Sequence, residues 1–112
     1  MMNPSPIFVR SYDLLRWLIP VTVKFPRQQR FVLAAALQRT ALELYERLIE
    51  AGKAAQPLPI LRQADVSLDK LRFYLRLCRD LELLSMGQYE HAARMTAEIG
   101  RLLGGWMKKA QP

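Results

Sequence analysis

At 112 residues the chain is long enough for one domain with a modest core and too short for two. Its 51% hydrophobic and 24% charged residues exclude a wholly disordered protein, and its longest apolar runs fall far short of the roughly 20 residues of a membrane span. The formal charge of +7, with a pI near 10.1, favours a polyanionic partner, either nucleic acid or an anionic membrane surface.

Apolar periodicity predicts an all-α protein, and no strand pattern competes with it. We expect a disordered lead at residues 1–6, helices at about 7–24, 26–51, 59–84 and 86–108, and a tail at 110–112. Short connections between helices of similar length favour an up-down-up-down four-helix bundle. Pro20 predicts a kink near residues 16–19 or an early end of the first helix, because an interior proline removes a hydrogen bond.

The second helix carries two adjacent apolar strips, which predict two buried contacts. One contact is expected inside the domain and the other with a second copy of the chain. The first strip contains Phe31, Ala34, Gln38, Ala41, Tyr45, Leu48 and Gly52, and the second contains Leu37, Ala41, Leu44, Leu48 and Ala51.

Further patterns describe the third and fourth helices. Ser85 and Gln88 match a capping box, in which each side chain bonds the backbone of the other residue. Gly104 and Gly105 weaken a helix interior, and we expect them to permit a close helix crossing. The third helix has a regular apolar seam of Leu61, Ala64, Leu68, Leu71, Leu75 and Cys78.

The chain shows no constellation of catalytic or metal-binding residues. Cys78 and His91 are each the only residue of their type, so neither zinc binding nor acid–base catalysis has a partner group. We therefore expect a protein that is not an enzyme, with no cofactor, metal or small-molecule substrate. The lone cysteine and the absence of a basic signal-peptide start predict a reduced, cytoplasmic protein.

The distribution of acids divides the basic residues into three groups. No acid occurs between Leu14 and Leu42, so cations there cannot be neutralised locally, and no acid follows Glu98. In the third helix nearby acids favour either a solvated ion-paired face, through Asp69–Arg72, Arg76–Asp80 and Arg79–Glu82, or nucleic-acid contact. The candidate nucleic-acid contacts are Arg16, Lys24, Arg27, Arg30 and Arg39, then Arg72, Arg76 and Arg79, then Arg101, Lys108 and Lys109.

The turn at Phe25–Pro26 is the centre of the first group. Lys24, Arg27 and Arg30 cluster there, and Arg30 is also a candidate for a structural pair with an acid on another helix. Twelve of the 17 basic residues are arginine, which suits phosphate contacts but also arises in GC-rich genomes. Two tryptophans, Trp17 and Trp106, are expected to pack in the core rather than stack on bases.

Several motifs in order resemble a known family over about residues 12–108. They are Phe25-Pro-Arg27 with Arg30-Phe-Val-Leu33, Thr40-Ala-Leu-Glu-Leu44, Leu48-Ile-Glu-Ala51, Arg76-Leu77 with Asp80-Leu81, and Ile99-Gly-Arg-Leu-Leu-Gly-Gly-Trp106. The chain resembles the four-helix-bundle family that includes the accessory variability determinant (Avd) of diversity-generating retroelements. The same family includes proteins encoded in intervening sequences of large-subunit ribosomal RNA genes.

The resemblance implies a basic homopentameric barrel without catalytic activity. It implies that such a protein binds RNA, with DNA as an open second partner, and also binds the retroelement's reverse transcriptase during mutagenic copying of a template-repeat RNA. Five copies at +7 each would carry +35 in all. Two alternatives stay open: a ribosomal-RNA intervening-sequence protein, and a structural or regulatory oligomer with no nucleic-acid role.

Overall fold

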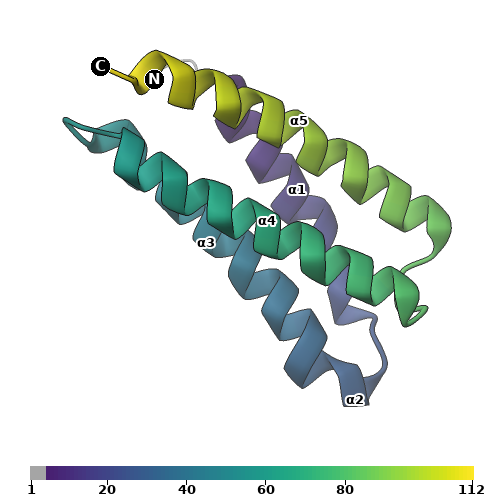
Figure 1. Cartoon of the computed structure of the whole chain (residues 1–112). Coiled ribbons are helices and arrows are strands. Elements are labelled where there is room, and N and C mark those ends of the chain that lie inside the picture. The colour runs from purple at the N-terminus through teal and green to yellow at the C-terminus, as the bar shows by residue number, and fades with distance from the viewer. Residues whose placement is uncertain (1–4) are drawn as a thin grey trace.

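The computed structural model describes residues 5–112, and these form an all-helical bundle (Figure 1). Residues 1–4 of the predicted disordered lead lie outside the described part, whereas Pro6 is already helical. The elements are α1 (Pro6–Val23), the short α2 (Arg27–Gln29), the π turn η1 (Arg30–Ala34), α3 (Ala35–Lys53), α4 (Leu58–Asp80) and α5 (Met86–Ala110).

The four long helices pack as a ring in which each contacts two neighbours. The order around the ring is α1, α3, α4, α5 and back to α1. Successive long helices run in opposite directions, which confirms the predicted up-down-up-down bundle (Figure 1). The bundle measures 45 × 24 × 22 Å. We call the end with the α1–α2 and α4–α5 connections the turn end, and the end with the α3–α4 loop the terminal end.

The apolar seam predicted for the third helix forms the centre of the core. Its six residues, Leu61 to Cys78, are each no more than 1% exposed. Equally buried leucines from the other helices face them, among them Leu18 of α1, Leu44 of α3 and Leu103 of α5. The predicted capping box is also present: Gln88 N–H donates to Ser85 Oγ at 3.0 Å, and Ser85 N–H donates to Gln88 Oε1 at 2.9 Å.

The first helix continues past its interior proline, so the early end predicted at Pro20 is wrong. α1 extends to Val23, and the buried Thr22 hydroxyl donates to the Ile19 carbonyl oxygen at 2.9 Å. The same hydroxyl accepts a hydrogen bond from Gln38 Nε2 at 2.8 Å. This bond joins α1 to α3 close to the proline.

α4, which corresponds to the predicted third helix, ends at Asp80, four residues before the predicted end at residue 84. Leu83 N–H donates to the Cys78 carbonyl at 2.8 Å and Glu82 N–H donates to the Arg79 carbonyl at 3.0 Å. These two bonds form a Schellman motif, which places one residue in the left-handed conformation. That residue is Glu82, with a φ of 62°.

The close crossing predicted at Gly104 and Gly105 is not formed within the described chain. Both glycines are exposed, and a Cβ added at either would meet no other atom within 4 Å. The crowded glycine is Gly100, where an added Cβ would collide with the guanidinium of Arg72 from α4. Arg72 reaches across this glycine and donates to the Thr96 carbonyl at 3.2 Å.

Candidate nucleic-acid interface

The turn end of the bundle begins with a tight connection anchored by one aromatic side chain. Phe25 is buried, and its N–H donates to the Thr22 carbonyl at 3.1 Å. Gln29 N–H donates to the Pro26 carbonyl at 2.8 Å, which starts α2 directly after the proline. Lys24 and Arg27 flank this anchored pair and are both exposed.

The π turn that follows changes which side chains face the core. Ala35 N–H donates to the Arg30 carbonyl, five residues back, instead of four as in an α-helix. Leu33 and Ala34 point inward and are buried, whereas Phe31 is 83% exposed and Val32 is 66% exposed. Phe31 and Ala34 therefore do not share one face, contrary to the prediction.

We call the stretch from Leu14 to Leu42, which contains no acid, the acid-free window. Its cations have no ion-pair partner within the described chain. Arg16, Lys24, Arg27, Arg30 and Arg39 are all exposed, and no described carboxylate oxygen lies within 4.0 Å of their nitrogens.

Arg30 has a structural contact, although its partner is not an acid. Its Nε donates to the Phe25 carbonyl at 3.1 Å, so this side chain helps to close the turn. Lys24 and Arg27 are the cations of the turn whose side chains make no hydrogen bond or ion pair in the described chain.

A carboxylate distant in sequence shares the neighbourhood of Lys24. A hollow of about 290 Å³ is lined by Lys24, Phe25 and Pro26 from one connection and by Glu82 and Leu83 from the other. The acid-free window in sequence is therefore not wholly acid-free in space. Glu82 makes no ion pair with Lys24, and sequence spacing gave no signal of this approach.

Two arginines of α4, the predicted third helix, make local contacts. Arg72 pairs with Asp69 at 3.1 Å, as predicted. Arg79 pairs with its neighbour Asp80 at 2.9 Å, and its guanidinium lies 4.5 Å from the centre of the Tyr89 ring. The predicted pairs of Arg76 with Asp80 and of Arg79 with Glu82 are absent from the described contacts. Arg79 and Asp80, one member of each predicted pair, form an ion pair with each other instead.

At the terminal end, Arg101 is also engaged. It pairs with Glu98 at 2.6 Å, and this hydrogen bond lowers the pKa of Glu98 and raises the pKa of Arg101. Lys108 and Lys109 are exposed and lie within 4.0 Å of no described carboxylate. Arg101 would have to give up its bond to Glu98 to bind a phosphate fully, whereas Lys108 and Lys109 have no ion pair to break.

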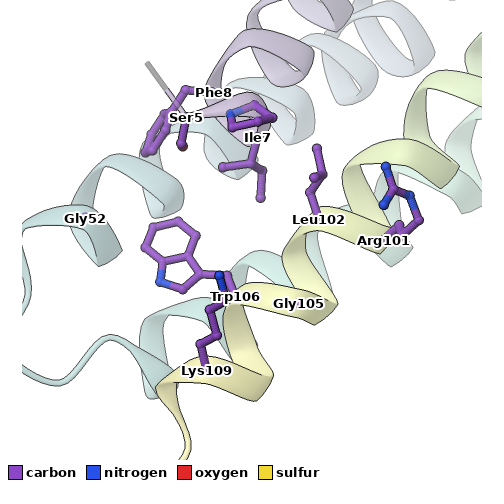
Figure 2. A pocket seen from close by; sticks show the side chains of 10 residues that line it. Ser5, Ile7, Phe8, Gly52, Arg101, Leu102, Gly105, Trp106 and Lys109 are labelled. Carbon is purple, nitrogen blue, oxygen red and sulfur yellow. The ribbon is translucent and has the colours of Figure 1, made fainter. Parts of the chain in front are cut away.

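The same end holds a hollow that is lined in part by aromatic side chains. Figure 2 shows Phe8 and Trp106 around this space, which measures about 520 Å³. Lys109 lies on its wall, and Gly52 and Gly105 leave it open. Sequence reasoning missed this hollow, because its walls come from α1, α3 and α5 together.

Both tryptophans pack against the core, as predicted. The Trp106 ring centre lies 6.2 Å from that of Phe8, and the Trp17 ring centre lies 4.9 Å from that of His91. Neither indole is therefore free for stacking over its whole face. Cys78 is buried too, and burial raises the pKa of its thiol to about 11.

The candidate cations do not form one patch on a single chain. Lys24, Arg27 and Arg30 lie at the turn end, whereas Lys108 and Lys109 lie near the other end of the 45 Å bundle (Figure 1). Within residues 5–112 no three His, Cys, Asp or Glu side chains gather as a metal site. No helix in the same range is both long and apolar enough to cross a membrane.

Comparison with known proteins places this arrangement in a family. No curated protein matches the chain. A crystal structure at 1.70 Å of a protein of unknown function from the S23 ribosomal protein family of Bacteroides thetaiotaomicron matches with a TM-score of 0.81 and 20% identity, over 91% of this chain and 98% of that one. This likeness shows a shared fold. The family model described as bAvd-like matches residues 7–110, so the chain belongs to the bAvd-like family.

Proposed function

We propose that this chain is a non-catalytic accessory protein of a diversity-generating retroelement. In this role it binds nucleic acid and the element's reverse transcriptase, and so supports mutagenic reverse transcription. Membership of the bAvd-like family supports the retroelement role. The observation that carries nucleic-acid binding is the group of exposed cations in the acid-free window, which have no ion-pair partner in the described chain.

The turn-end cations are better placed for phosphate than Arg72 and Arg79 of α4. Arg72 and Arg79 must give up bonds to Asp69 and Asp80 before they can bind a phosphate fully. Lys24 and Arg27 are exposed and have no described ion pair to break. Each phosphate that a cation neutralises adds about 0.7 to 0.9 to the slope of log affinity against log salt concentration.

Exposed apolar side chains on neighbouring helices support assembly of several copies. Leu42 and Ile49 lie seven residues apart on α3, and Val66 and Phe73 lie seven residues apart on α4; all four are 42–60% exposed. We propose that these faces pack in a homopentamer, in which the formal charge of +7 per chain repeats five times. Size-exclusion chromatography with light scattering tests this assembly, and a monomer at micromolar concentration would refute it.

The test of nucleic-acid binding uses a pair of charge-matched variants. Lys24→Glu with Arg27→Glu changes the turn end, and Arg62→Glu with Arg94→Glu changes exposed arginines elsewhere that have no described ion pair. Each double variant replaces two cations by two acids, so each lowers the charge from +7 to +3.

We expect the turn-end variant to lose affinity for RNA of any sequence and to lower the salt slope by about 1.4 to 1.8, the contribution of two phosphates. The matched control should lose less affinity and retain more of the slope. Equal salt slopes for the parent and the turn-end variant would place the nucleic-acid surface elsewhere, with Arg101, Lys108 and Lys109 as the next group to change. Light scattering checks that both variants assemble like the parent.

The reverse-transcriptase partnership needs a separate experiment. A reverse-transcriptase gene beside this gene, and co-purification of its product with this chain, are expected. The fold shared with a member of the S23 ribosomal protein family favours the second candidate, an intervening-sequence protein of ribosomal RNA. A gene lying inside a large-subunit ribosomal RNA gene would support that alternative instead.

A further inference from the structure

The most exposed large apolar side chain of the described chain lies beside its free cations. Phe31 is 83% exposed and follows Arg27 by four residues, with Val32 also exposed next to it. We propose that Phe31 is a stacking platform for an unpaired base, so that the turn end prefers single-stranded nucleic acid over duplex. This inference rests on the proposed function and assigns its substrate class.

The exposure of Phe31 follows from the π turn. In a regular α-helix Phe31 would share a face with Ala34 and Gln38, which lie on the side of α3 that faces the bundle. The π turn contains more residues per turn than an α turn, so it rotates the residues before it around the helix axis. Phe31 therefore leaves the core face and points to solvent. Turns of this kind occur frequently at functional sites.

The charges near Phe31 indicate which kind of partner covers its ring. Arg27 and Phe31 lie four residues apart in one continuous helical segment at the turn end, and both side chains are exposed. Arg27, Lys24 and Arg30 have no described carboxylate within 4.0 Å. An apolar protein surface covering Phe31 would bury these cations without partners, which is unfavourable.

A single nucleic-acid strand satisfies both kinds of side chain. Its phosphates pair with the cations, and an unpaired base offers a flat face to the phenyl ring. In a duplex both faces of each base are already covered by its neighbours in the stack, so Phe31 would gain little there. Aromatic stacking raises affinity by roughly tenfold per base, with little dependence on sequence.

The experiment compares Phe31→Ala with Phe31→Trp. The probes are a labelled RNA strand of about 12 nucleotides, within the range that single-strand sites cover, and a duplex of the same sequence. Fluorescence anisotropy gives the affinity for each probe. We expect Phe31→Ala to weaken single-strand binding about tenfold and duplex binding less than twofold. Phe31→Trp should retain single-strand binding, because the larger ring also stacks.

Three results would overturn the inference. One is equal binding of the strand by the parent and Phe31→Ala, and another is an equal loss on both probes. The third is a change of mass in light scattering or a loss of reverse-transcriptase binding in Phe31→Ala with strand affinity intact, which would place Phe31 in a protein interface. A failure of the proposed function itself looks different: the parent would bind neither probe, or Lys24→Glu with Arg27→Glu would bind both normally.

Discussion

Replacing Glu82 with glycine should stabilise the bundle. Glu82 is the only non-glycine residue with positive φ in the part of the chain that the structure describes, at 62°. In this conformation the side chain of an L-residue crowds the following carbonyl, whereas glycine has no Cβ. The Schellman bonds to Cys78 and Arg79 use only backbone atoms, so they remain in the variant.

The expected gain is about 1 kcal/mol, the lower end of the penalty for a left-handed non-glycine residue. Loss of the carboxylate should matter little, because Glu82 is exposed and makes no described ion pair. For a domain of this size, that gain raises the melting temperature by roughly 3–6 °C.

Urea unfolding followed by far-ultraviolet circular dichroism measures the change, at one protein concentration because assembly would otherwise shift the midpoint. Glu82→Ala is the matched control, since it removes the same carboxylate but keeps the Cβ. Glu82→Asn should fall between the two, because asparagine tolerates the left-handed region better than alanine. If the glycine and alanine variants are equally stable, the backbone explanation is wrong and the charge is responsible.

Three further predictions concern single side chains. Gly100→Ala should stabilise the protein more in an Arg72→Ala background than in the parent, because the new Cβ would displace the Arg72 guanidinium. A double-mutant cycle by urea unfolding measures the difference, and equal effects in both backgrounds would show that Arg72 moves away without cost. Gly104→Ala should add about 0.5–1 kcal/mol to the free energy of unfolding, and a loss would indicate a neighbouring chain packed on this glycine. With its pKa raised to about 11 by burial, the Cys78 thiol should react with iodoacetamide at pH 8 only after unfolding, and rapid labelling of folded protein would contradict this.

The helices and the core seam were predictable because they repeat one local rule. A spacing of three and four residues places Leu61, Leu68 and Leu75 on one face, and nothing between Leu58 and Asp80 interrupts the helix. The capping box is equally local. In the same way, the absence of acids around Lys24 and Arg27 predicted that these cations would lack ion pairs, since most surface pairs join residues close in sequence.

The errors arose where tertiary structure decides the outcome. α4 ends through a left-handed glutamate, although the usual residue for that position is glycine. The π turn has no marker in the sequence, so Phe31 was placed on the wrong face. Which glycine is crowded depends on where the Arg72 side chain lies, and the approach of Glu82 to Lys24 depends on two connections that meet at one end.

The start of α1 and the end of α5 lie close together, because Ile7 and Lys109 line the same hollow (Figure 2). A tag, dye or surface linker inserted directly before α1 or directly after α5 would therefore be anchored near the same end of the bundle. Immobilisation through such a linker would leave the α1–α2 turn facing the solution, nearly the full 45 Å length away. The same closeness makes the bundle suitable for circular permutation, with a short linker joining the end of α5 to the start of α1 and new termini opened in the α3–α4 loop.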